Sequence, residues 1–166
     1  MKTIKTVVYD FDELSDEAKQ KAINNLSDIN VDFEWWDSTY DDAENIGLKI
    51  TGFDIGRGCY VNGGLIHSVK RCCELIMENH GTNCETYILA NRVSNDLAKL
   101  SEQDLDESEH NDLCEEIEAD FLRDLCDCYL TILRDEYEYK TSDDAIIEMI
   151  QANEYTFLSN GTMKNF

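Results

Sequence analysis

The chain has 166 residues, of which 42% are hydrophobic, enough to bury a core, and we expect a single domain over residues 1–166. Its net charge of −22 argues against direct binding to nucleic acid or to an anionic membrane, because both are also negatively charged. Such a charge attracts basic partners instead, either a cation or a protein whose basic groove handles nucleic acid.

Cysteine usage and hydropathy favour a cytoplasmic protein. The seven cysteines are an odd number, Cys72 and Cys73 are adjacent, and no leader sequence precedes them. This pattern is typical of reduced thiols rather than of a disulfide framework. No apolar run approaches the roughly 20 residues that span a membrane as a helix. We therefore expect no membrane insertion.

The first third of the chain alternates between strand and helix signals. Residues 3–9 are β-branched and aromatic and predict a strand. Ser15, followed by two acids, is suited to cap a first helix. Aromatic residues spaced by three and four predict a second helix over residues 31–46. Gly47 then stands where a left-handed C-cap belongs, and residues 48–53 predict a strand.

A glycine-rich stretch over residues 52–64 predicts a loop or bulged hairpin between short strands. Gly56 and Gly58 match the first two glycines of a dinucleotide-binding fingerprint, but Val61 stands where the third belongs. No Gly-Lys-Ser/Thr of a phosphate-binding loop follows. We therefore interpret Gly56, Arg57 and Gly58 first as a structural turn, with phosphate binding as the alternative.

The second half of the chain reads as mostly helical. Apolar periodicity predicts helices over residues 65–80 and 84–100, followed by an acidic connection over residues 101–108. Thr141, with an acid three residues later, resembles a capping box that starts a short final helix. Asn160-Gly161 lies between two strand-like runs, which is a strong hairpin signal. We expect one small antiparallel sheet, built from the N-terminal strand, the middle strands and this hairpin, covered by helices in an α+β fold.

The strongest pattern is a long helix over residues 107–139. Its apolar residues form one broad arc, which is typical of a helix packed on a core; they are Leu113, Ile117, Phe121, Leu122, Leu125, Cys126, Tyr129, Leu133 and Tyr137. Its other side carries carboxylates at steps of three and four, with Thr131 filling one gap of eight. We call this side the acidic face, and its members are Asp112, Glu116, Asp120, Asp124, Asp127, Asp135 and Glu138.

The acidic face is unfavourable for the helix itself, because like charges at i,i+4 cost about 0.2–0.5 kcal/mol per pair. Lysines between the acids would relieve this repulsion, yet only Arg123 and Arg134 occur. Two interpretations follow. Either the carboxylates only keep the chain in solution, or they form the surface that binds a partner.

Several motifs occur in an order that resembles a known family. Tyr-x-Phe-Asp-Glu-Leu-Ser-Asp-Glu-Ala-Lys stands at residues 9–19, Glu-Trp-Trp-Asp at 34–37 and Gly-Phe-x-x-Gly-x-Gly at 52–58. Glu-Tyr-x-x-x-Thr-Ser-Asp follows at 136–143 and Ala-Asn-Glu-Tyr-x-Phe at 152–157. This arrangement resembles small acidic proteins of bacteriophages and prophages, which sometimes carry the label of antitoxins of toxin–antitoxin stability systems.

The resemblance implies a phage origin and an accessory role in the cytoplasm of a bacterial host, but it implies no particular activity. It departs from the family in the glycine-rich stretch. The family often has Ser-Gln-Gly-(Asp/Glu)-Gly, where this chain has Asp54-Ile55-Gly56-Arg57-Gly58. Any role that the family's glutamine and acid perform there is therefore not expected here.

No motif predicts catalysis, a cofactor or a metal. The only histidines are His67, His80 and His110, and Cys-x-x-C does not occur. A zinc site would require the convergence of residues distant in sequence, namely Cys72, Cys73, His80 and Cys84. Because no nucleophile, base and orienting group can be placed together, we do not expect an enzyme.

Two functions remain. The first is a phage-encoded inhibitor whose acidic face mimics nucleic acid and binds a host protein with a basic groove: a nuclease, a helicase, a defence complex or, for an antitoxin, a basic toxin. The second is a small-ligand protein that sequesters a nucleotide signal, with phosphate contacts from Arg57, Lys70 and Arg71. The sequence predicts no particular oligomeric state.

Overall fold

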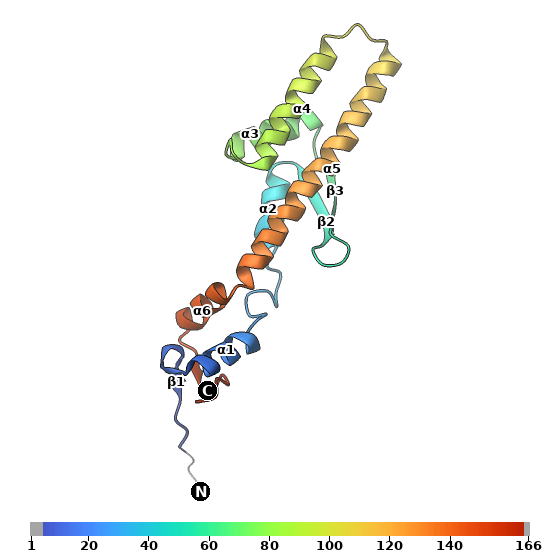
Figure 1. The fold of residues 1–166 in the computed structure, drawn as a ribbon. Helices are drawn as coiled ribbons and strands as arrows, with labels where there is room; N and C mark the ends of the chain where they lie inside the picture. Colours follow the sequence, from blue (N-terminus) through green and yellow to red (C-terminus); the bar gives the residue numbers. More distant parts are fainter. Residues whose placement is uncertain (1–4, 165–166) are drawn as a thin grey trace. The chain divides into compact units, whose positions relative to one another are not determined.

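The computed structural model describes residues 5–164 and confirms the α+β class (Figure 1). The chain divides into two compact units. Unit 1 comprises Met1–Trp35 and Glu136–Phe166, and unit 2 comprises Trp36–Asp135. The long helix α5, Glu107–Lys140, contributes its last five residues to unit 1 and the rest to unit 2. The single domain that we expected stays a prediction.

Unit 1 is a small helical layer with a two-stranded ribbon. Helix α1 spans Asp16–Asn25 and helix α6 spans Asp143–Ala152. Strand β1, Tyr9–Asp10, pairs antiparallel with β4, Thr156–Phe157, and the short 3-10 helix η1 follows at Phe11–Glu13. Side chains from α1, η1, α6 and β4, with Leu14 after η1, form one core, and Tyr9 of β1 packs against it. The core consists of Phe11, Leu14, Ala18, Ala22, Ile23, Ile146, Ile150 and Phe157.

In unit 1 the predicted cap of α1 and the predicted turn near the C-terminus are confirmed, and the cap of α6 lies one residue from its predicted position. The Ser15 hydroxyl accepts a hydrogen bond from the Ala18 N–H at 3.3 Å and caps α1 as predicted. Helix α6 is capped by Ser142, one residue after the predicted Thr141. The predicted turn at Gly161 is present with φ of +79°, and a Cβ there would overlap the carbonyl oxygen of Ala18. Only glycine fits that position.

Unit 2 contains two strands, three complete helices and most of α5. Its elements are α2, Asp37–Asn45; β2, Leu48–Asp54; β3, Tyr60–Leu65; α3, Val69–Asn79; and α4, Glu85–Ser101. Strands β2 and β3 form an antiparallel hairpin with an irregular register between Ile50 and Gly52, which confirms the predicted bulged hairpin. Gly47 has φ of +93° and ends α2 as predicted.

Four expectations about strands and helix boundaries are wrong. Helix α3 begins at Val69 and not at residue 65, because Leu65 ends strand β3. The strands form two separate sheets, β1–β4 and β2–β3, instead of one. Of the predicted strand over residues 3–9, only Tyr9 is in β1; residues 3 and 4 lie outside the described part. Helix α2 begins at Asp37 and not at residue 31, because residues 31–36 form turns. Local propensity does not predict which strands pair or where a helix begins, because both depend on contacts with residues distant in the sequence.

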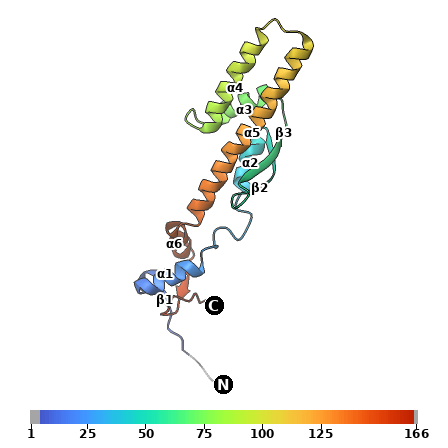
Figure 2. The ribbon, with the colours of Figure 1, turned by 45° about the vertical axis from the view of Figure 1, so that its right-hand side comes forward.

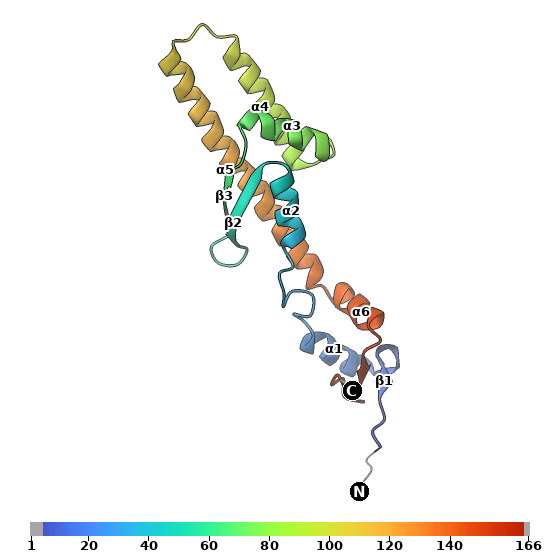
Figure 3. The ribbon, with the colours of Figure 1, turned by 180° about the vertical axis from the view of Figure 1, so that it is seen from behind.

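Figures 1, 2 and 3 show α4 and α5 side by side, joined at one end by the loop over residues 102–106. The core of unit 2 lies under α5, whose Phe121, Leu125, Tyr129 and Leu133 are at most 1% exposed. Helix α3 adds the fully buried Cys72, Cys73 and Ile76. In residues 5–164 we find no helix with both the length and the apolarity to cross a membrane.

A polar network ties α5 to the rest of unit 2. The Tyr129 hydroxyl donates to Asp42 Oδ2 at 2.7 Å. His80 Nε2 lies 3.3 Å from Asp42 Oδ1, and His80 Nδ1 lies 2.6 Å from Thr86 Oγ1. Hydrogen bonds from His80 and Tyr129 lower the pKa of Asp42. Burial, and then the neighbouring Asp42, raise the pKa of Tyr129.

We expect Asp42→Asn to lower the free energy of unfolding by about 1 kcal/mol at neutral pH, because it weakens the contacts with Tyr129 and His80. The effect is small, because the Asp42 side chain is 49% exposed. Folding lowers the pKa of Asp42, so its stabilising contribution is present above the unfolded value of about 3.9 and is lost as the pH falls through the folded value. Urea unfolding of wild type and variant at about pH 7 and about pH 2 measures the difference, which should shrink at the lower pH.

Asp41→Asn is the matched control, since it removes the same charge from the exposed neighbouring residue. A cost for Asp41→Asn equal to that for Asp42→Asn would contradict the assigned role of the network.

Candidate functional site

The acidic face is exposed along α5. Six of its seven carboxylates lie in unit 2, and Glu138 lies in unit 1. Asp112, Glu116, Asp120, Asp127, Asp135 and Glu138 are exposed, and Asp124 is partly covered, with 29% of its side chain accessible. On the other side of α5 the middle of the apolar arc is buried, at Phe121, Leu125, Cys126, Tyr129 and Leu133. Its two ends are not buried, since Leu113 is 36% and Tyr137 38% exposed. The two sides therefore separate as their spacing indicated only along the middle of the helix.

Arginines neutralise the middle of the face. Arg92 on α4 contacts Asp124 through Nη2 and Oδ2 at 2.7 Å. Arg123 contacts Asp124 at 3.0 Å and Asp120 at 2.7 Å. Burial alone would raise the pKa of Asp124, but the hydrogen bonds from Arg92 and Arg123 outweigh it and hold that pKa below its usual value.

The ends of the face in unit 2 differ from its middle. Within residues 5–164 no ion pair involves Asp112, Glu116, Asp127 or Asp135. These four exposed carboxylates are therefore available to an outside cation. Sequence spacing found the acids but missed Arg92, whose pairing with α5 depends on how the two helices pack.

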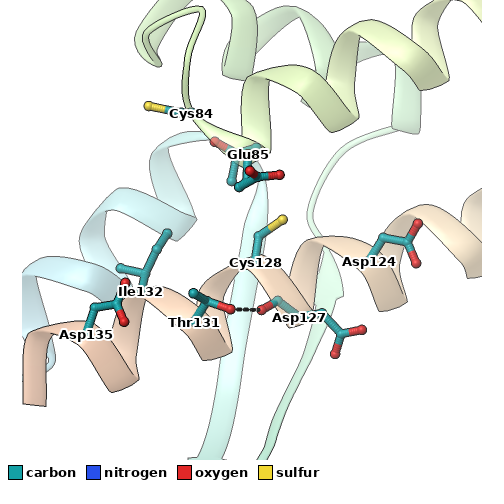
Figure 4. A pocket seen from close by; sticks show the side chains of 9 residues that line it. Cys84, Glu85, Asp124, Asp127, Cys128, Thr131, Ile132 and Asp135 are labelled. Atoms are coloured by element: carbon teal, nitrogen blue, oxygen red, sulfur yellow. Dashed lines mark hydrogen bonds between the residues drawn. The ribbon is translucent and has the colours of Figure 1, made fainter. Parts of the chain in front are cut away.

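A hollow of about 700 Å³ lies where the start of α4 faces α5 (Figure 4). Three members of the acidic face line it, together with Glu85, the thiols of Cys84 and Cys128, and Ile132, which is 38% exposed. Figure 4 shows Cys128 directly below Glu85, while the thiol of Cys84 points in another direction. The hollow therefore combines an apolar wall with carboxylates.

Burial makes several thiols of unit 2, among them Cys73 and Cys128, poor nucleophiles. Burial, and then Glu85, raise the pKa of Cys128, so its thiol stays protonated at neutral pH. Burial raises the pKa of Cys73 to about 11. The described residues hold no group of three or more His, Cys, Asp or Glu side chains placed to bind a metal ion, and the hypothetical zinc ligands near Cys72 and Cys84 do not converge.

Two backbone amides of the glycine-rich loop are already hydrogen-bonded to a carboxylate of the same hairpin. Asp54 accepts the Gly56 N–H through Oδ1 at 2.7 Å and the Gly58 N–H through Oδ2 at 2.9 Å. A phosphate would have to displace this carboxylate to reach the two amides. Arg57 is exposed in the same loop, while Arg71 already pairs with Glu74 at 3.1 Å. This geometry favours the structural turn over phosphate binding.

Comparison with protein-family models, with curated proteins and with solved structures finds no match to this chain. The resemblance to small acidic phage proteins therefore stays a hypothesis.

Neutralising a paired carboxylate on α5 and neutralising an unpaired one should change the free energy of unfolding in opposite directions. We expect Asp124→Asn to lower the free energy of unfolding by up to about 1 kcal/mol, because it breaks the contacts with Arg92 and Arg123. We expect Asp127→Asn to raise it by about 0.3 kcal/mol, because it relieves repulsion between like charges. Urea unfolding at low salt compares the two variants, and changes of the same sign would contradict the assigned pairing.

Proposed function

We propose that this chain is a phage-encoded accessory protein that binds and inhibits a basic, nucleic-acid-handling protein of a bacterial host. The observation that carries the proposal is the set of exposed, unpaired carboxylates at Asp112, Glu116, Asp127 and Asp135 on one side of α5. They belong to a unit with 22 acidic and 8 basic residues, a net charge of −14. A face of this kind attracts a basic groove at long range and accelerates association.

The length of the face, more than the spacing of its charges, supports mimicry of nucleic acid. Carboxylates at steps of three and four rise about 4.5–6 Å each along a helix, against about 3.4 Å for successive phosphates of one strand. From Asp112 to Asp135 the helix rises about 35 Å, close to the length of one turn of B-DNA. A basic groove shaped for one strand of a duplex would therefore meet negative charge along a comparable length.

The proposed partners form a class of proteins that share a basic surface. Nucleases, helicases and defence complexes bind nucleic acid through basic grooves, and a basic toxin neutralised by an antitoxin offers the same chemistry. We favour these protein partners over a nucleotide signal, because the loop amides at Gly56 and Gly58 are already bonded to Asp54. We propose no enzymatic activity.

The test is capture of partners from a bacterial lysate on the immobilised chain, with bound proteins identified by mass spectrometry. We expect basic proteins that elute as salt is raised, because screening weakens attraction between exposed charges. Neutralising the four unpaired carboxylates, as Asp112→Asn, Glu116→Gln, Asp127→Asn and Asp135→Asn together, should abolish that capture.

A matched control neutralises four exposed acids away from the face, at Asp41, Glu44, Glu102 and Asp104, and so changes the net charge equally. Its capture should remain close to wild type. Partners that resist salt, or that are lost equally with both variants, would overturn the proposal.

A further inference from the structure

The hollow at the start of α4 continues along the seam between α4 and α5. A second hollow of about 220 Å³ shares Glu85, Asp124 and Cys128 with it. A third, of about 270 Å³, shares Arg92 and Asp124 with the second and extends to Ile117. We call the three together the α4–α5 groove. Along α5 it extends from Ile117 to Asp135, a rise of about 27 Å.

The groove offers apolar side chains to a partner. Ile88 on α4 is 52% exposed and Ile132 on α5 is 38% exposed, and both line it. Leu89 and Phe121 also line it and are almost fully buried. Half-exposed isoleucines within a groove lose contact with water when a partner's apolar side chain covers them, which stabilises the complex.

Carboxylates border these apolar side chains. Glu85 and Asp96 contribute from α4, and Asp120, Asp127 and Asp135 contribute from α5. The two arginines that line the groove, Arg92 and Arg123, are both engaged with Asp124. The charge of the border therefore fits an occupant that carries basic side chains on either side of an apolar stripe.

We propose that the α4–α5 groove binds a basic amphipathic helix of the partner protein. This inference rests on the proposed function, since it takes the partner to be basic. A helix fits better than an extended segment, because the backbone groups inside α4 and α5 are bonded within their own helices and offer no ladder to a strand. An incoming helix satisfies its own backbone and needs only side-chain contacts.

The Arg92–Asp124 contact crosses the middle of the groove. Arg92 is 60% exposed at its side chain, so this bridge is weak and a basic side chain of the partner can replace it. Binding thus exchanges an internal ion pair for an intermolecular one. Removal of Arg92 should free Oδ2 of Asp124, while Oδ1 stays paired with Arg123, and should thereby strengthen binding.

The test uses a synthetic 18-residue peptide, a length of about 27 Å as a helix, with leucines at helical spacing and lysines elsewhere. Its affinity for the full chain is measured by fluorescence anisotropy at low and high salt. Ile88→Ser should weaken binding about tenfold at both salt concentrations, since the lost contact is apolar. Ile132→Ser is a second variant with the same expectation, and circular dichroism confirms that both fold.

Two matched controls isolate the groove. Ile66→Ser alters an isoleucine of similar exposure, 43%, outside the groove and should leave the affinity unchanged. Arg92→Gln should tighten binding more than Arg134→Gln, although both remove one positive charge from exposed arginines. A peptide of the same composition with its helical spacing scrambled should bind at least tenfold more weakly at high salt.

Equal effects of Ile88→Ser and Ile66→Ser, or equal binding of the scrambled peptide, would overturn the groove while leaving the acidic face intact as the binding surface. Capture of basic proteins that does not depend on the four unpaired carboxylates would instead overturn the proposed function. The two failures are therefore distinguishable.

Discussion

The burial of one side of α5 is the interaction on which unit 2 depends. Phe121, Leu125, Tyr129 and Leu133 are almost inaccessible, and each such side chain contributes about 1.5–3 kcal/mol when it is removed from water. Repulsion between carboxylates on the other side costs only about 0.2–0.5 kcal/mol per pair. Packing therefore outweighs the local electrostatics of the helix, and a run of acids too unfavourable for an isolated helix becomes a stable surface.

The same contacts fix which side of α5 meets solvent. The bond between Tyr129 and Asp42 ties the helix to α2, and the bond between Arg92 and Asp124 ties it to α4. Rotation of α5 by one residue would carry carboxylates toward the core, which burial of charge forbids. The acidic face and the apolar seam beside it are thus held in one register. This is why a single surface can offer both charge and apolar contact to a partner.

Sequence patterns correctly predicted the features that depend only on residues close together in the chain. The period of α5 repeats over 34 residues, and the helix cap at Ser15 and the turn at Gly47 depend on only a few positions. The pairing of strands into two sheets was missed, because β1 meets its partner β4 at the other end of the chain. Arg92 and Glu85 were missed for the same reason, since their approach to α5 follows from packing. In the glycine-rich loop the sequence predicted the turn, but not the hydrogen bonds from the Gly56 and Gly58 amides to the Asp54 carboxylate.

Competition with nucleic acid tests the central claim most directly. A captured basic partner would be loaded with a labelled DNA duplex, and the chain would then be titrated in while DNA release is followed by anisotropy. If the acidic face of unit 2 occupies the basic groove, the duplex leaves as the chain binds, and the variant lacking the four unpaired carboxylates releases none. A ternary complex, in which the partner holds the duplex and the chain together, would contradict the claim.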